Sequence, residues 1–163
     1  MSHSSGVGES SRIEWQWAAF SELAPIELYE AMALRQRVFV VEQDCVYQDA
    51  DGRDSAAWHL LGWATGSGKT TLFGYARVFE AGARYAEMSI GRIVSAPEVR
   101  GSGVGRAIVR EAMRKCTELW PKQPIRIAAQ RRLEQFYEAF GFAAAGDPYD
   151  EDGIDHIDMV KPA

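Results

Sequence analysis

Hydrophobic and polar residues follow two different periods along this chain, and each period predicts a different kind of element. Apolar residues recur at helical spacing within residues 25–41, 104–119 and 131–140, which is typical of helices with one buried face. Shorter apolar runs bounded by turn residues predict strands. The expected strands cover residues 13–20, 58–64, 71–80, 84–95, 125–129, 142–149 and 154–161.

The helix expected at residues 104–119 has the most regular pattern. One face carries an apolar stripe made of Val104, Ile108, Ala112, Cys116 and Leu119. Pro25 suits the first turn of the first helix, and Gly141 is expected to cap the last helix in the left-handed conformation. The resulting order, β-α-β-β-β-α-β-α-β-β, predicts an α/β fold with one mixed sheet flanked by helices.

Length and composition are consistent with one folded domain. The chain has 163 residues, of which 47% are hydrophobic, so it can bury a substantial core. Residues 1–12 are rich in Ser and Gly and lack periodicity, so we expect a disordered arm or a tag remnant there. The folded domain is then expected to span residues 13–163.

Several classes of function are disfavoured by charge and composition. A net charge of −5 argues against nucleic-acid binding, and no apolar stretch approaches the roughly 20 residues of a membrane-spanning helix. The two cysteines, Cys45 and Cys116, are far apart and lack metal-binding spacing, which favours a reduced, cytoplasmic protein. We expect no metal site, because the acid-rich segments place Tyr47 or Pro148 where a calcium loop needs its first ligand.

The clearest chemical pattern lies in residues 92–105, Arg-Ile-Val-Ser-Ala-Pro-Glu-Val-Arg-Gly-Ser-Gly-Val-Gly. A strand runs into a loop with three glycines, Gly101, Gly103 and Gly105, and a helix follows at once. Such a loop exposes backbone N–H groups, and the start of the helix adds partial positive charge. The pattern therefore predicts an anion site suited to a pyrophosphate.

Two other phosphate-binding patterns fit poorly. A dinucleotide fingerprint needs G-x-G-x-x-G with an acidic residue about twenty positions later, and neither requirement is met here. The segment Gly66-Ser67-Gly68-Lys69-Thr70-Thr71 resembles part of a P-loop, but the first glycine is out of place and a strand pattern follows instead of a helix. We interpret residues 66–69 as a hairpin turn.

Two separate segments resemble the GNAT superfamily of N-acetyltransferases. Arg100-x-x-Gly103-x-Gly105 is similar to the pyrophosphate-binding segment of that superfamily, Gln/Arg-x-x-Gly-x-Gly/Ala. Residues 131–142, Arg-Arg-Leu-Glu-Gln-Phe-Tyr-Glu-Ala-Phe-Gly-Phe, resemble its Phe-Tyr-x-x-Phe-Gly-Phe segment. At finer grain, residues 34–43 and 149–157 look like the ElaA family, a bacterial branch, and the resemblance covers most of the chain after residue 30.

The resemblance implies acetyl-CoA as cofactor and assigns residues to hold it. Backbone groups of Ile93 and Val94 would pair with the pantetheine arm like an added strand. Gln130 stands where the superfamily often has Asn, so its contact with the cofactor is less secure. The pyrophosphate would lie against Arg100, Gly101, Ser102, Gly103, Val104, Gly105 and Arg106.

The resemblance also implies a general acid, Tyr137. A phenol, with a reference pKa of about 10, can donate a hydrogen bond or a proton to the departing sulfur. The alternative is a core aromatic residue, because Tyr137 also continues the apolar stripe of its helix. Glu42 is the best carboxylate candidate for the general base, with His59, His156 or a water molecule as alternatives.

Candidate acceptor-binding residues are Arg37, Glu42, Gln43, Asp51 and His156. Arg37 would bind an acceptor carboxylate if it faced the cleft, and would otherwise pair with a neighbouring acid. Acidic residues gather in residues 44–54 and 147–155, where they either attract a cationic amine or form hydrophilic turns.

We therefore expect an N-acetyltransferase that transfers an acetyl group directly to a primary amine, either a small molecule or a peptide, within a ternary complex. One alternative is an acyl-CoA-binding sensor without catalytic activity. Another is an acyltransferase with a longer acyl donor, because Arg37-Val38-Phe39 also resembles acyl-homoserine-lactone synthases. The oligomeric state is left open, with a homodimer as one candidate.

Overall fold

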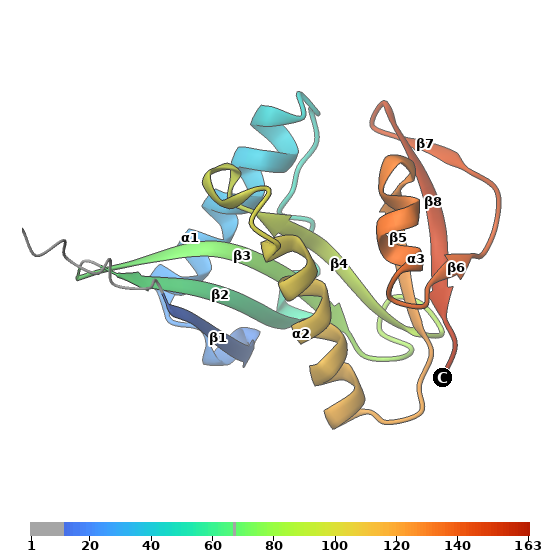
Figure 1. Ribbon diagram of the computed structural model, residues 1–163, viewed down its shortest axis with the longest axis horizontal. Helices are drawn as coiled ribbons and strands as arrows, with labels where there is room; N and C mark the ends of the chain where they lie inside the picture. Colours follow the sequence, from blue (N-terminus) through green and yellow to red (C-terminus); the bar gives the residue numbers. More distant parts are fainter. Residues whose placement is uncertain (1–11, 67) are drawn as a thin grey trace, which may run out of the picture.

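Eight strands form one mixed sheet in the computed structural model, which describes residues 12–66 and 68–163 (Figure 1). The strands are β1 (Arg12–Ala19), β2 (Trp58–Gly66), β3 (Lys69–Phe79), β4 (Met88–Ser95), β5 (Ile125–Gln130), β6 (Ala143–Ala144), β7 (Tyr149–Glu151) and β8 (Ile154–Lys161). Their order is β1-β2-β3-β4-β5-β8-β6, and β7 also pairs with β8. Among the strands of the described residues, only β4 and β5 pair in parallel. The predicted α/β class with a mixed sheet is confirmed.

Helices cover both faces of this sheet. They are α1 (Pro25–Arg35), α2 (Val104–Leu119) and α3 (Glu134–Glu138). Ile108 of α2 and Tyr137 of α3 belong to one buried core, whereas Ala31 and Leu34 of α1 belong to a second. No helix among the described residues combines the length and apolar character needed to cross a membrane.

The helix predictions hold at α2 and need correction elsewhere. Helix α2 has the predicted bounds, and its stripe is buried except for Leu119, which is 42% exposed. The first helix is α-helical only to Arg35, and Gln36–Glu42 continue it with wider π-type turns. The third predicted helix becomes a 3₁₀ turn, Arg131–Leu133, followed by the short α3.

Two strand predictions also change at their ends. β4 begins at Met88 and not at residue 84, because the chain first makes a turn in which the Gly82 N–H donates to the Tyr85 carbonyl oxygen at 2.7 Å. The strand predicted for residues 142–149 divides into β6 and β7. The predicted turn between β2 and β3 is present, since Gly66 pairs with Lys69. The arm predicted at residues 1–12 lies outside the described residues, apart from Arg12, where β1 begins.

A break in the sheet positions the functional site. β4 and β5 pair at only two positions, Met88 with Ile125 and Ser89 with Arg126, and then diverge (Figure 1). Parallel strands that separate leave the facing N–H and C=O groups of each strand without a partner in the sheet. The edge of β4 beyond Ser89 can therefore accept an extended ligand as an added strand.

Candidate active site

A cleft of about 590 Å³ occupies the space between the diverging strands. β4 contributes Ile93 and Val94 to its wall, and β5 contributes Gln130. The loop that follows the first helix and the β7–β8 hairpin also line it. Residues from four distant parts of the chain thus meet in one cavity.

The glycine turn follows β4 after a short 3₁₀ turn, Pro97–Val99, and lies at one end of this cleft. Gly101 and Gly103 have φ values of 81° and 84°, in the left-handed region that favours glycine, and a Cβ at either position would meet no atom within 4 Å. Gly103 is the N-cap of α2, and no side chain among the described residues caps that helix. The N–H groups of the first turn of α2 are thus free to bind an anion, and there is open space beside them. The turn therefore has the features of the anion site that the sequence predicts.

The residues expected to bind the cofactor divide into two groups. Ile93, Val94, Arg100 and Gln130 line the cleft. The remaining residues, Gly101, Ser102, Gly103, Val104, Gly105 and Arg106, continue outwards from Arg100 and lie outside the lining. The expected cofactor site is therefore continuous in the structure, with its pyrophosphate segment at the rim.

A β-bulge interrupts the pairing of β4 with β3. Tyr75 pairs with Val94, and Arg77 pairs with Gly91. Two residues of β4 therefore lie between these pairs, opposite a single residue of β3. Arg92 lies in this bulge with a φ of 49°, which is unusual for a residue other than glycine. A bulge leaves backbone groups outside the regular ladder and often lies beside an active site. This bulge adjoins Ile93 and Val94 in the cleft wall.

Tyr137 lines the cleft from α3 with a side chain that is almost fully buried, at 6% exposed. Burial raises the pKa of its phenol to about 12, against a smaller opposing effect of the Arg132 charge. The hydroxyl group therefore keeps its proton at neutral pH and can act as a donor. Tyr137 is both a core aromatic residue and a cleft residue, so the two interpretations from the sequence are compatible.

The three candidate bases have different surroundings. Glu42 lines the cleft but forms an ion pair with Arg100 at 2.6 Å. His59 is fully buried outside the cleft lining, with its ring nitrogens 2.6 Å from the Tyr75 hydroxyl and 2.9 Å from the Asp54 carbonyl oxygen. Both nitrogens of His59 are thus occupied, and His59 cannot reach an acceptor in the cleft.

His156 lines the cleft from β8. Its Nδ1 lies 2.7 Å from the Ile154 carbonyl oxygen, which can only accept a hydrogen bond. Nδ1 therefore carries the proton, and Nε2 of the neutral ring has a free lone pair. The nearest carboxylate to Nε2 is that of Glu151, at 3.8 Å.

The other predicted acceptor-binding residues are partly brought together. Gln43 and Asp51 line the cleft, and the Gln130 amide donates to Gln43 at 3.2 Å. Arg37 does not line it, because its exposed guanidinium forms an ion pair with Glu98. The alternative stated for Arg37, pairing with a neighbouring acid, is the arrangement found.

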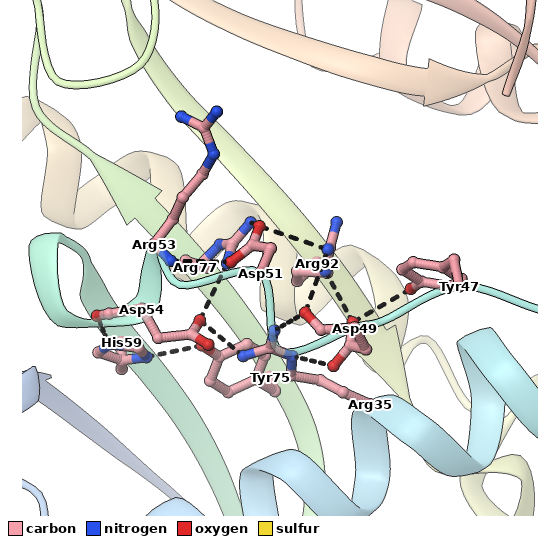
Figure 2. A network of polar contacts seen from close by, with 10 residues as sticks. All are labelled: Arg35, Tyr47, Asp49, Asp51, Arg53, Asp54, His59, Tyr75, Arg77 and Arg92. Atoms are coloured by element: carbon pink, nitrogen blue, oxygen red, sulfur yellow. Dashed lines mark hydrogen bonds and ion pairs between the residues drawn. The ribbon is translucent and has the colours of Figure 1, made fainter.

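The acid-rich loop after the first helix is folded onto buried arginines (Figure 2). Arg35 is fully buried, and its guanidinium contacts Asp49 and Asp54 at 2.8 Å each. Arg77, also fully buried, contacts Asp51 and Asp54 at 2.9 Å each. We call this cluster, together with Arg92, the arginine–aspartate network.

Arg92 connects this network to the bulge of β4 (Figure 2). Its side chain contacts Asp49 at 2.8 Å and Asp51 at 3.5 Å. Asp49, Asp51 and Asp54 of the loop are therefore neutralised by arginines of the first helix, β3 and β4. The expectation that this acidic cluster attracts a cationic amine is not supported, because Asp51, the member that lines the cleft, is already bound to Arg77 and Arg92.

Sequence reasoning overlooked Arg35, Arg77 and Arg92 as a unit. One signal was present: Arg77 is the only charged residue within residues 72–79, in the middle of an apolar strand. A buried arginine requires a carboxylate partner. The acid-rich loop was the available source, but the pattern could not say which acid would reach which arginine.

The network is expected to make the free energy of unfolding depend on pH in the acid range. Burial alone would raise the pKa of Asp51 and Asp54, but hydrogen bonds and charge from their arginine partners outweigh it and lower both pKa values. A carboxyl group with a lowered pKa stabilises the folded state fully above its unfolded pKa of about 4, and this contribution disappears as the pH falls below that value. We expect the free energy of unfolding, measured by urea titration, to fall between about pH 5 and pH 3. Asp51→Asn should flatten this dependence and the exposed Asp147→Asn should not, so equal slopes would contradict the assignment.

The chain is similar to known acyltransferases over most of its length. The family model described as acetyltransferase (GNAT) domain matches residues 29–163. Protein ElaA of Escherichia coli (strain K12) is 40% identical over 151 residues, covering 91% of this chain and 96% of that protein. A UPF0039 protein of Synechocystis sp. is 43% identical over 148 residues, covering 91% of this chain and 94% of that one.

Two solved structures agree with these relatives. The crystal structure of Escherichia coli ElaA has a TM-score of 0.84 at 39% identity, covering 92% of this chain and 99% of ElaA. An acyl-CoA N-acyltransferase from Pseudomonas aeruginosa has a TM-score of 0.85 at 34% identity, with the same coverage of 92% and 99%. This family uses an acyl-CoA donor and an amine acceptor. The chain belongs to the GNAT acetyltransferase family as an ElaA-like member, and it is an acyltransferase.

Proposed function

We propose that this protein transfers an acetyl group from acetyl-CoA directly to a primary amine, within a ternary complex. The observation that carries the proposal is the cleft between β4 and β5, which has the uncapped glycine turn at one end and a protonated tyrosine in its wall. Acetyl-CoA supplies an activated thioester when it is bound. The tasks left to the protein are to hold the thioester, to take a proton from the amine and to stabilise the charge that develops.

The β4 edge holds the donor in this proposal. Ile93 and Val94 pair with the pantetheine arm, and the N–H groups of the turn from Gly101 to Arg106 bind the diphosphate, except that of Ser102, which donates to the Val99 carbonyl oxygen at 3.3 Å. The N–H of a residue in the bulge, next to Val94, donates to the carbonyl oxygen as it becomes negative. A bulge suits this task, because its N–H groups are not all engaged by β3.

His156 is the proposed general base. Its Nε2 has the free lone pair and accepts a proton from the amine nitrogen as the N–C bond forms. Glu42, the first choice from the sequence, forms an ion pair with Arg100. Its proposed role is to hold the two segments that it connects in place at the opening of the cleft. We assign Gln43 to the same task, through its contact with Gln130.

Tyr137 is the proposed general acid. As the C–S bond breaks, its hydroxyl donates to the sulfur, which leaves as a thiol. The proton taken up by His156 and the proton lost by Tyr137 are both exchanged with water after product release, so the protons balance.

The test of this function is thiol release from acetyl-CoA when a panel of amines is added. A transferase releases free thiol with at least one amine. Tight acetyl-CoA binding without thiol release would favour the sensor without catalytic activity. Preferential turnover of hexanoyl-CoA or octanoyl-CoA would favour the transferase with a longer donor.

Replacing Gly103 with valine is expected to weaken acetyl-CoA binding by roughly 10- to 100-fold, the value of one charge-assisted hydrogen bond. A β-branched residue is strained at a φ of 84°, so the turn must change shape and its N–H groups move away from the diphosphate. Isothermal titration calorimetry with acetyl-CoA measures the change.

Gly68→Val is the matched control for Gly103→Val. Gly68 has a φ of 71° with no atom within 4 Å of an added Cβ, so the backbone strain is similar. It lies in the turn between β2 and β3, outside the cleft lining. Unchanged affinity for acetyl-CoA in Gly103→Val, or an equal loss of affinity in both variants, would show that the glycine turn does not bind the diphosphate.

A further inference from the structure

Arginines outnumber carboxylates among the residues that line the cleft. The chain has a net charge of −5, yet six arginines and four carboxylates line the cleft. The arginines are Arg53, Arg84, Arg92, Arg100, Arg126 and Arg132. Any arginine of this set that has no carboxylate partner can attract an anionic ligand into the cleft.

Most of these arginines already have a partner. Arg92 contacts Asp49, Arg100 contacts Glu42, and Arg126 contacts Glu87 and Asp158 at 3.0 Å each. Arg132 donates to the Gln130 amide oxygen at 3.1 Å. Among the described residues, Arg53 and Arg84 are the cleft arginines whose guanidinium groups contact neither a carboxylate nor an amide oxygen.

Arg53 is exposed, and its guanidinium points away from the arginine–aspartate network (Figure 2). The nearest acid along the chain, Asp51, is not available to it. Its carboxylate contacts Arg77 at 2.9 Å and Arg92 at 3.5 Å, and also accepts the backbone N–H of Arg53 at 3.0 Å. The charge of Arg53 is therefore left for a ligand.

Arg84 is held in place without being neutralised. Its guanidinium lies over two aromatic rings of the cleft wall, 5.9 Å from the centre of Phe79 and 5.4 Å from the centre of Tyr85. Such cation–π contacts attract the guanidinium without neutralising its charge, and its N–H groups remain able to bind a carboxylate or a phosphate.

These two arginines are remote from the expected site of the coenzyme diphosphate. Arg84 precedes β4, whereas the glycine turn follows it, and eight strand residues span roughly 25 Å. Arg53 lies between Asp51 and Asp54, the two residues that bind Arg77, and Arg77 pairs with Gly91 in the first half of β4. The diphosphate therefore cannot be the ligand that Arg53 and Arg84 bind.

We propose that Arg53 and Arg84 bind an anionic group, a carboxylate or a phosphate, on the amine acceptor. This inference rests on the proposed N-acyltransferase function. The β7–β8 hairpin contributes His156, Glu151 and Asp152 to the cleft lining. These side chains suit the amine end of such a molecule. The acceptor is then an amine that also carries negative charge, such as an amino acid or an aminoalkyl phosphate.

Matched pairs of acceptors test the proposal by thiol release from acetyl-CoA. The proteinogenic L-amino acids are compared with their carboxamides, and phosphoethanolamine is compared with ethanolamine. We expect the anionic member of the best pair to have a kcat/KM at least about tenfold higher, as one charge-assisted contact requires. The comparison of amino acids with carboxamides tests a carboxylate, and the comparison of phosphoethanolamine with ethanolamine tests a phosphate, so together they identify the preferred anion.

Two variants locate the anion site. Arg53→Gln and Arg84→Gln should each raise the KM for the anionic acceptor roughly tenfold, with kcat and acetyl-CoA affinity kept, because they remove binding that ground state and transition state share. Neither should change the KM for the neutral partner of the pair. Arg110→Gln, at an exposed position of α2 outside the cleft, is the control.

The outcomes separate this inference from the proposed function. Equal turnover of anionic and neutral members, or variants that leave the KM unchanged, would overturn the anion site while the transferase stands. Acetyl-CoA binding without thiol release from any amine would contradict the transferase. In that case, the same pairs are compared by thermal shift of the acetyl-CoA complex, and an absence of preference for the anionic members overturns the anion site as well.

Discussion

Arg35→Met is expected to lower the free energy of unfolding by about 3–5 kcal/mol, because it leaves Asp49 and Asp54 buried beside one cation fewer. Methionine retains most of the apolar stem, so the lost charge and hydrogen bonds dominate. For a chain of this length, such a loss corresponds to a fall of roughly 10 °C in Tm. Urea denaturation and calorimetry measure the two quantities.

Arg37→Met is the matched control, because Arg37 lies two residues further along and also forms an ion pair. That pair, with Glu98, is 52% and 60% exposed on its two sides, whereas the Arg35 side chain is 0% exposed. Exposed ion pairs contribute little to stability. We expect the Tm of Arg37→Met to match the wild type, and equal losses in the two variants would show that burial of the network does not determine its contribution.

The second large effect is expected from Tyr137→Phe, which should lower kcat by about 10²- to 10⁴-fold. Phenylalanine keeps the ring that packs in the core and removes only the hydroxyl that donates to sulfur. The Kd for acetyl-CoA, measured by calorimetry, should stay unchanged, because the hydroxyl acts on the reacting atoms and not on the coenzyme diphosphate. Thiol release with a saturating acceptor measures kcat.

Tyr29→Phe is the control for the loss of a phenol, since Tyr29 is 70% exposed on α1. It should retain wild-type kcat and Tm. A wild-type kcat in Tyr137→Phe at every pH would leave Tyr137 as a core residue and remove it from the chemistry. A fall in Tm together with kcat would instead indicate a packing defect.

The network and the active site share one element, the bulge of β4. Arg92 has an unusual backbone conformation there, and both aspartates that hold its side chain come from the acid-rich loop. A residue with positive φ persists only where its surroundings hold it. Ion pairs that look like a device for stability therefore also hold the part of β4 where the thioester is expected to react.

Local patterns in the sequence were sufficient for the fold class and for the glycine turn that is expected to bind the cofactor. Helix α2 was predicted with its bounds, because its apolar stripe and the glycines before it are local signals. Gly103 at a φ of 84° follows from the same principle, since only glycine adopts that turn without strain. The Tyr137 segment was recognisable for a similar reason, because neighbouring aromatic residues on one short helix appear together in the sequence.

Only the tertiary structure decided which charges are free. The acids of residues 44–54 look available in the sequence, but Asp49, Asp51 and Asp54 reach arginines on three other elements. Such pairing depends on how strands far apart in the chain come together, and composition carries no record of it. The same long-range packing placed Arg37 outside the cleft and brought Arg53 and Arg84 into it. Charge was therefore visible in the sequence, whereas its neutralisation was a property of the folded protein.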